Sequence, residues 1–555
     1  MRHSSLLVLF SALAVTHALG ADAYLERPPT DDVVYFLLPD RFANADKSND
    51  RGGLKGDRLT TGFDPTSKAF YHGGDLAGVI SQLDAVQALG ATAIWLAPVF
   101  KNKPVQGPKG QESAGYHGYW VTDFTRVDPH LGDERTMHEL VDAAHARGMK
   151  VYLDIIANHT ADVISYRECP TRACPYRSRA EYPAKAYTPF IPRGEEHVKV
   201  PEWLNDTAYY HNRGNSTFAG ESSEGGDFSG LDDLATENPR VLQGFIDIFG
   251  TWIDQYRIDG YRIDTARHVN PEFWQGFVPA MRARAAAKGI DNFYIFGEVA
   301  TEGLDTAQLA RYTRVAKLPA VLDFAFAYAV RVTTSGNAGT DVLARLFADD
   351  ALYEGGEPTA LKLPTFISNH DMGRFAWFVR VDRPQVSDDE VLKRVSLAHA
   401  MLMTLRGVPV IYYGDEQGYA GTGNDQDARQ DMFPSQTPSY LADRRIDSIA
   451  PLLTELAKTR DAYKALRGGR QIVRNYSDKP GLFAVSRIDP VSGRELVIAF
   501  NTSMESLRTV MEVLAESKRF TSVHGDCAPA PREPKSYPLT LAPLAFVICA
   551  AGESE

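Results

Sequence analysis

The chain has few cysteines, little positive charge for its size and almost no long apolar runs. Its 555 residues include four cysteines, and 71 acidic side chains outnumber 59 basic ones, for a formal net charge of -12. This acidic balance argues against a protein that binds nucleic-acid phosphates. The sequence also lacks internal repeats and low-complexity tracts. A substrate that is neutral or linked to a cation fits these features better.

The one long apolar run lies at the N-terminus. Residues 6–19 follow a basic start and precede small residues at Gly20, Ala21 and Ala23. This pattern, shorter than a membrane span, is typical of a secretory signal peptide. We predict that residues 1–23 are cleaved and that the protein is exported to the periplasm or the medium, with an uncleaved anchor as the alternative. No other segment is apolar over a spanning length, so no membrane span is expected in the mature chain.

The four cysteines agree with export, because disulfides form in oxidising compartments. Cys169 and Cys174 are close enough to staple a loop, and Cys527 and Cys549 bracket the last apolar segments. Three pairings are possible, and we expect each cysteine to pair with its nearest neighbour. A zinc site is the competing interpretation, but no histidine lies at ligand spacing.

Strand-like apolar runs alternate with amphipathic, helix-like stretches through most of the chain. Repeated strand and helix is typical of a parallel sheet, and a (β/α)8 barrel needs eight such strands. Helices are expected at 78–89, 135–146, 239–256 and 391–405. The predicted strands are 33–38, 93–97, 151–156, 260–264, 293–298, 321–326, 363–368 and 408–413.

Two regions break this alternation. After the third strand comes a long stretch rich in Pro, Gly and Tyr, where a barrel loop normally takes a handful of residues. Near the C-terminus, short alternating segments indicate an antiparallel β-sandwich. We therefore predict a TIM barrel built from residues 24–158 and 239–463, a small inserted domain at 159–238 and a β-sandwich at 464–555.

Three carboxylates end strand-like segments: Asp264, Glu298 and Asp371. In barrels of this kind the chemistry takes place at the carboxyl ends of the strands. Two carboxyl groups about 5 Å apart cleave a glycosidic bond with retention of configuration. A single strand-end acid is more often a cap or part of an ion pair, but the set of three indicates a glycosidase.

Sequence strings around these acids resemble a known family. DIIANHT at 154–160, GYRIDTARH at 260–268, FGEV at 296–299 and SNHD at 368–371 are similar, in order and spacing, to the four signature regions of the α-amylase superfamily, glycoside hydrolase family 13. GYHGYW at 115–120 and GVPVIYYGDE at 407–416 add to the resemblance. It is weakest in the insertion and in the C-terminal region.

The resemblance implies roles for the acids. Asp264 is expected to be the nucleophile, Glu298 the general acid and base, and Asp371 a third carboxylate that orients substrate hydroxyls. Arg262 lies two residues before Asp264 on a strand, so it should point to the same side and keep that aspartate ionised. The apolar neighbours of Glu298 should favour its protonated form.

The same resemblance implies four substrate-binding residues. His159 and His370 match donors to substrate hydroxyls, and His117 and Tyr119 match the wall of the cleavage subsite, with Tyr119 stacking on a sugar ring. A lone histidine or tyrosine is more often a core or surface residue, so these assignments depend on the surrounding motifs.

Calcium is the implied cofactor. Asn158, Asp233 and the carbonyl of His268 match the family's site, which ties the insertion to the barrel through hard oxygen ligands. A hydrogen-bonded hinge without metal is the alternative. A second cluster resembles an N-terminal calcium loop of cyclodextrin glucanotransferases, although such loops are usually solvated turns. Its members are Asn44, Asp46, Asn49, Asp50, Gly73 and Asp75.

Departures from the subfamilies bear on the reaction. Glucanotransferases carry an aromatic residue where this chain has Ser229, although Phe228 is adjacent. They also carry aromatic residues where Val299 and Ala300 follow the acid. The loss of these acceptor-binding rings favours hydrolysis over transfer. Arg267 stands where many α-amylases have lysine, so the resemblance does not define the details of the acceptor side. No additional N-terminal β-domain and no starch-binding module are expected.

The sequence therefore predicts a monomeric, retaining hydrolase of α-1,4-glucosidic bonds in starch or maltooligosaccharides. A glucanotransferase-type transglycosidase and a cyclomaltodextrin or α-glucoside hydrolase are the alternatives. A non-catalytic amylase-fold binding protein is a distant one, because the full set of acids is present.

Overall fold

The structure is a computed structural model that describes residues 23–171, 173–432 and 446–552. The predicted signal peptide lies outside the described residues except for Ala23, where helix α2 (Ala23–Glu26) begins. Within the described ranges, no helix combines the length and apolar character needed to cross a membrane.

Seven parallel strands form the central sheet in the order β13-β12-β7-β2-β1-β15-β14. Every residue of these strands is buried, as expected for a parallel sheet covered by helices. The strands are β1 (Val34–Leu37), β2 (Ala93–Leu96), β7 (Lys150–Ile156), β12 (Gly260–Asp264), β13 (Tyr294–Gly297), β14 (Pro364–Thr365) and β15 (Val408–Tyr412).

The barrel closes without an eighth regular strand, so the predicted strand at 321–326 is wrong. Val321 makes a single parallel bridge to Gly297, and helix α10 (Phe324–Val330) begins three residues later. The carboxylate of Asp323 caps this helix by accepting from the Phe326 amide at 2.9 Å, which ends the extended segment. Backbone bonds from Leu322 to Gly297 and from Asp323 to Pro364, both 2.9 Å, join β13 to β14 and complete the (β/α)8 barrel.

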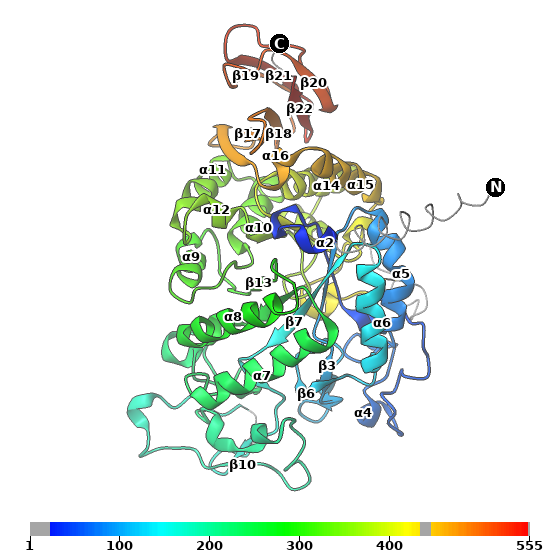
Figure 1. The fold of residues 1–555 in the computed structure, drawn as a ribbon, viewed down its shortest axis with the longest axis vertical. Coiled ribbons are helices and arrows are strands. Elements are labelled where there is room, and N and C mark those ends of the chain that lie inside the picture. The colour runs from blue at the N-terminus through cyan, green and yellow to red at the C-terminus, as the bar shows by residue number, and fades with distance from the viewer. Residues whose placement is uncertain (1–22, 172, 433–445, 553–555) are drawn as a thin grey trace, which may run out of the picture.

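Helices surround the sheet (Figure 1). Aspartates cap several of them; Asp75 and Asp133, for example, accept from amides in the first turns of α5 and α6. The larger helices are α5 (Leu76–Ala88), α6 (Glu134–His145), α7 (Pro239–Tyr256), α8 (Pro271–Ala286), α9 (Thr306–Arg314), α11 (Asp341–Ala348), α13 (Phe375–Asp382), α14 (Asp388–Thr404) and α15 (Ala450–Ala462).

The segment between β7 and α7 contains short antiparallel pairs and 3-10 turns. Strand β8 (His159–Thr160) pairs with β11 (Asp232–Asp233), and β9 (Ser165–Tyr166) pairs with β10 (Pro189–Phe190). The Cys169–Cys174 disulfide lies within this segment. In Figure 1 it occupies the end of the molecule opposite the C-terminal strands. Nearby, β3 (Phe100–Asn102) pairs with β6 (Val121–Val127), and β4 (Val105–Gln106) with β5 (Ser113–Ala114).

The C-terminal strands form a five-stranded antiparallel sheet and a two-stranded one. Alternation along β18 explains their packing: Leu496 and Ile498 join the large core, whereas Val497 and Ala499 join a second, separate core. The Cys527–Cys549 disulfide lies here, so both predicted pairings are confirmed. The strands are β16 (Arg470–Asn475), β17 (Leu482–Ile488), β18 (Glu495–Asn501), β20 (Phe520–His524) and β22 (Phe546–Ala551) in one sheet, with β19 (Leu507–Glu512) and β21 (Ser536–Leu541) in the other.

Candidate active site

Two of the three predicted catalytic carboxylates contact one arginine at the carboxyl ends of neighbouring strands. Asp264 is the last residue of β12 and Glu298 directly follows β13. Arg262 donates from Nη1 to Asp264 Oδ1 at 2.8 Å and from Nη2 to Glu298 Oε2 at 2.9 Å. The backbone amide of Thr265 also donates to Glu298 Oε2 at 2.9 Å. Both acids are buried.

The charge balance of this group differs from the one predicted. Arg262 was expected to serve Asp264 alone, but it contacts both acids, so it does not by itself separate an ionised nucleophile from a protonated acid. Burial raises the pKa of Asp264, Arg262 opposes that shift, and the neighbouring carboxylates add to it. One guanidinium group therefore contacts Asp154, Asp264 and Glu298 at once.

Asp154 is a member of the site that the sequence analysis quoted in a motif without giving it a role. Its Oδ1 lies 2.7 Å from Arg262 Nη1. Its Oδ2 accepts from Trp95 Nε1 at 3.2 Å and from the Tyr119 hydroxyl at 3.0 Å. Burial raises the pKa of Asp154 to about 7, although Arg262 opposes the shift. A charged residue inside a fully buried strand was the signal that could have identified it.

Asp371 lies further out than the other two acids. Its side chain is 47% exposed, and its Oδ1 accepts from Arg429 Nη2 at 2.9 Å. Burial would raise the pKa of Asp371, but His370 and Arg429 outweigh it and lower the pKa below its ordinary value. Arg429 also donates to the His370 carbonyl at 3.0 Å, so it fixes the turn that carries Asp371. Arg429 was not predicted as a site residue, because it lies on a loop outside the motifs.

The structure brings together three of the predicted binding residues. The Tyr119 ring stacks against His370 and His117, with centroids 5.4 Å and 5.6 Å apart. The Tyr119 hydroxyl lies 2.8 Å from His370 Nε2. Burial lowers the pKa of His370 to about 3 and the pKa of His117 well below its ordinary value. These histidines are therefore neutral near pH 7, when one ring nitrogen donates and the other accepts.

The remaining predicted histidine lies against an aromatic cluster. Burial lowers the pKa of His159 to about 3, and its ring stacks on Phe228 with centroids 5.5 Å apart. Phe228 also packs edge-on against His268 at 5.2 Å and Phe218 at 5.1 Å. Phe218 is 42% exposed. We call the rings of Phe218, Phe228 and His268 the aromatic wall.

The aromatic wall lies next to Ser229, where an aromatic residue is missing. Phe228 directly precedes Ser229, and the exposed Phe218 packs against Phe228. Phe218 and Ser229 both have positive φ angles, 58° and 54°. Such values are uncommon for residues with a side chain and often accompany functional sites.

The residues predicted for the first calcium site fit a hard cation. Pairing of β8 with β11 places His159 opposite Asp233, next to Asn158. Asn158 Oδ1 is buried and has no hydrogen-bond partner within the described part of the chain. Asp233 is buried too, and its Oδ2 lies 2.5 Å from His211 Nδ1. Burial raises the pKa of Asp233 to about 6, and His211 opposes the shift. Among the described residues, no three or more His, Cys, Asp or Glu side chains are placed so that they could hold a metal ion together. Amide and carbonyl oxygens would therefore have to complete the ligand set.

The second predicted cluster also assembles. Asn44 Nδ2 donates to Asp50 Oδ1 at 2.7 Å, and a Cβ on Gly73 would lie 2.6 Å from each of these two atoms. Asp75 accepts from the Asp46 amide at 2.8 Å and from Asn49 Nδ2 at 3.4 Å. The exposed carboxylate of Asp46 instead binds the Ser48 hydroxyl at 2.6 Å. Asp46 therefore joins the cluster through its backbone.

Comparison with known proteins agrees with this geometry. Residues 36–444 match the family described as "Alpha amylase, catalytic domain". The chain is 45% identical over 488 residues to an alpha-amylase of Streptomyces lividans, an alignment that covers 81% of this chain and 53% of that protein. It is 30% identical over 434 residues to a cyclomaltodextrin glucanotransferase of Geobacillus stearothermophilus, covering 76% of this chain and 54% of that protein. The chain thus spans about half the length of these curated relatives.

Solved structures show the same similarity. An alpha-amylase from Geobacillus thermoleovorans, complexed with acarbose, has a TM-score of 0.73 and 28% identity, covering 95% of this chain and 100% of that one. The cyclomaltodextrin glucanotransferase CldA, with a three-domain ABC distribution, has a TM-score of 0.76 and 26% identity, covering 94% and 99%.

The barrel and its ring of carboxylates define an enzyme class, the glycosidases built on a (β/α)8 barrel. The family match covers well over half of the chain. This chain therefore belongs to the α-amylase family, glycoside hydrolase family 13.

Proposed function

We propose that this enzyme hydrolyses α-1,4-glucosidic bonds of starch or maltooligosaccharides with retention of configuration. The observation that carries the proposal is that Asp264 and Glu298, from adjacent strands, contact the same guanidinium group of Arg262. Carboxylates held this close can flank one glycosidic bond, as retention requires.

In the first step, the Asp264 carboxylate attacks the anomeric carbon while Glu298 gives its proton to the departing glycosidic oxygen. The products are a glycosyl ester on Asp264 and a shortened sugar. In the second step, ionised Glu298 takes a proton from water as the water oxygen attacks the anomeric carbon. The ester bond to Asp264 breaks, and the acid regains its proton.

The surrounding residues have binding and orienting roles in this proposal. Neutral His159 and His370 donate hydrogen bonds to substrate hydroxyls, and Asp371, held by Arg429, accepts them. Tyr119 offers an aromatic surface to a sugar ring, with His117 behind it. Asp154 orients Arg262 and, through it, both reacting acids.

An α-glucan is the substrate best supported by the relatives, which are named alpha-amylase and cyclomaltodextrin glucanotransferase. We favour hydrolysis over transfer because Ser229, Val299 and Ala300 replace aromatic residues. Phe218 and Phe228 keep the transglycosidase as the second candidate, since they offer rings to an acceptor sugar.

Two calcium sites are part of the proposal. Asn158, Asp233 and the His268 carbonyl would hold one ion, and Asn44, Asp50, Gly73 and Asp75, with the backbone of Asp46, would hold another. Bound calcium would fix the insertion and the N-terminal loop in place and would take no part in the bond-breaking steps. The two disulfides fit an exported protein, and we propose that the enzyme works outside the cytoplasm as a monomer.

Product analysis on maltoheptaose tests the reaction. Proton NMR taken immediately after mixing should show new α-anomeric reducing ends, and chromatography should show shorter maltooligosaccharides in dilute solution. Initial β-anomers would contradict retention. If the products were mainly longer or cyclic glucans, the enzyme would be a transglycosidase and not a hydrolase. If no α-glucan were cleaved, the remaining interpretation would be a non-catalytic amylase-fold binding protein.

A further inference from the structure

A cavity lined mainly by residues of the insertion lies apart from Asp264, Glu298 and Asp371. Its volume is about 580 Å³, within the range of about 300–1,000 Å³ that is usual for small-ligand sites. Asp227 lines it, whereas the next residue, Phe228, packs on His159 and His268. Because consecutive side chains of an extended segment point to opposite sides, this segment separates the cavity from the aromatic wall.

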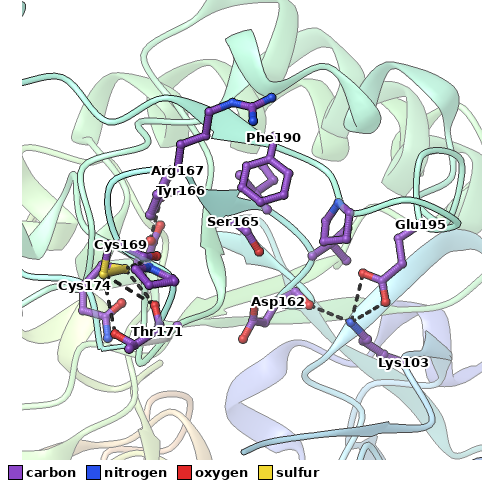
Figure 2. Close-up of a pocket in the computed structure, with 17 residues that line it drawn as sticks. Lys103, Asp162, Ser165, Tyr166, Arg167, Cys169, Thr171, Cys174, Phe190 and Glu195 are labelled. Atoms are coloured by element: carbon purple, nitrogen blue, oxygen red, sulfur yellow. Dashed lines mark hydrogen bonds and ion pairs between the residues drawn. A yellow bond between two sulfur atoms is a disulfide. The ribbon is translucent and has the colours of Figure 1, made fainter.

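The cavity combines flat apolar surfaces with hydrogen-bonding groups. Figure 2 shows the Phe190 ring and the Ser165 side chain between the Cys169–Cys174 disulfide on one side and the ion pair of Lys103 with Glu195 on the other. Tyr166 lines the same space, and its ring stacks on Tyr187 with centroids 4.7 Å apart. Flat rings beside hydroxyl and carboxylate groups suit a ligand that has both an apolar face and many hydroxyls.

The charges in the cavity disfavour an anionic ligand. Lys103 Nζ lies 3.1 Å from Glu195 Oε1 and donates to the Asp162 carbonyl at 2.9 Å. The Arg167 guanidinium lies over the Phe190 ring, 5.1 Å from its centroid. The Glu195 carboxylate therefore faces a cation that is already engaged, and Asp227 accepts from the Tyr166 hydroxyl. Carboxylate oxygens accept hydrogen bonds from hydroxyl groups, so a neutral polyhydroxyl compound matches this lining.

The lining is held rigidly before any ligand arrives. Asp227 is 6% exposed, and its Oδ2 accepts from the Tyr166 hydroxyl at 2.8 Å. Ser165 and Phe190 are paired directly across β9 and β10. The nearby disulfide fixes the loop beside them. A rigid lining lowers the ordering cost of binding.

We propose that this cavity is a second carbohydrate-binding site, which holds a short α-glucan segment outside the catalytic cleft. The identity of the sugar rests on the proposed function, because a neutral polyhydroxyl ligand near a glucan-cleaving centre is most simply a piece of that glucan. The Phe190 ring packs on a sugar face, and Ser165 and Glu195 take its hydroxyls.

Calorimetric titration with maltotriose tests the proposal. The Glu298→Gln variant is used so that the sugar is not consumed during the measurement. We expect two binding events. Adding Phe190→Ala should weaken one of them by roughly tenfold or more, and adding Ser165→Trp, which fills the cavity, should abolish the same event. Tyr328→Ala, which removes a ring that is 39% exposed on α10, is the matched control and should leave both events unchanged.

Activity measurements separate this inference from the proposed function. With Glu298 intact, Phe190→Ala and Ser165→Trp should keep kcat/KM on a short chromogenic maltoside within about twofold, since that substrate fills only the catalytic cleft. Thermal melts of both variants establish that the insertion still folds. A single binding event in Glu298→Gln, or two events that neither cavity variant alters, would overturn the second site while leaving the hydrolase intact. If maltotriose binds nowhere and maltoheptaose is not cleaved, both proposals fall.

Discussion

Arg262 and Asp154 form a buried ion pair beside Asp264 and Glu298, with Nη1 2.7 Å from Oδ1. The two residues lie opposite each other in the register of β12 and β7. The guanidinium group that contacts Asp264 and Glu298 is therefore anchored from below by a third carboxylate, which itself accepts from Trp95 and Tyr119. We infer that Asp154 is a positioning residue, which would act on the reaction through Arg262.

We expect Asp154→Asn to lower kcat by roughly tenfold to a hundredfold, because a poorly held arginine misplaces both acids. KM should change little. The pH dependence of kcat/KM should change as well, because burial raises the pKa of Asp154 to about 7 and the asparagine no longer titrates beside Arg262. The control is Asp259→Asn, at the other end of the same strands, where Asp259 accepts from the Val151 amide at 2.8 Å. A loss of stability in both variants, without any change in the pH profile, would assign Asp154 a structural role only.

The Glu298→Gln variant should discriminate between substrates by leaving group. On maltooligosaccharides kcat should fall by about 10²–10⁴, because the leaving oxygen must be protonated. On glucosides with activated leaving groups the first step needs no proton, so the loss should be much smaller. Azide should partly restore Glu298→Ala but not Asp264→Ala. Equal losses on both substrate types, with no azide rescue, would remove Glu298 from the acid role.

Removal of calcium should lower stability and activity together. A ligand that binds only the native state stabilises it by mass action, so excess chelator should lower Tm by about 5 °C or more. Asp233→Ala should remove the part of the response that arises at the insertion, and Asp50→Ala the part that arises at the N-terminal loop. An identical melting curve with and without chelator, after prolonged incubation, would contradict both sites.

The aromatic wall should set the balance between water and sugar as acceptor. A ring that faces an acceptor glucose contributes about 0.5–1.5 kcal/mol, which corresponds to roughly two- to tenfold in the ratio of transfer to hydrolysis. Phe228→Leu should lower this ratio and Ser229→Tyr should raise it. Total turnover should fall in Ser229→Tyr because φ is 54° at that position. Chromatography of maltoheptaose products at low and high acceptor concentration measures the ratio of transfer to hydrolysis and the total turnover. Unchanged ratios in the two variants would show that these positions do not face the acceptor.

Glu416 should make the protein less stable as pH rises. Burial raises the pKa of Glu416 from 4.5 to about 7, and the Tyr35 hydroxyl donates to it at 2.9 Å. Asp415 and Arg374 are its charged neighbours. The folded form keeps the proton that the unfolded chain releases, so this contribution is full below about pH 4.5 and is lost as pH rises through 7. Glu416→Gln should flatten the decline in Tm between pH 5 and pH 8, worth about 1–3 kcal/mol. A decline as steep as in the unchanged protein would refute this assignment.

Strand periodicity and motif spacing were sufficient for much of the fold. The alternation of apolar runs with amphipathic stretches predicted seven of the eight barrel positions as strands, because burial on both faces leaves continuous apolar runs in the sequence. The prediction of an eighth strand at 321–326 failed because the same apolar run also suits a buried helix, and Asp323 caps that helix. The disulfide pairs followed from sequence proximity.

Spatial relationships between segments that lie far apart in the sequence required the tertiary structure. The sequence alone was enough to predict the barrel, the family and three candidate catalytic acids, since each prediction depends on local pattern or on ordered motifs. It placed Arg262 beside Asp264 only, because strand alternation relates residues on one strand and says nothing of Glu298 on the next. Arg429, Phe218 and the cavity behind Phe228 depend on how loops pack across the insertion and the barrel. Loop packing leaves no periodic signal, so only the assembled molecule decided which side chains share the site.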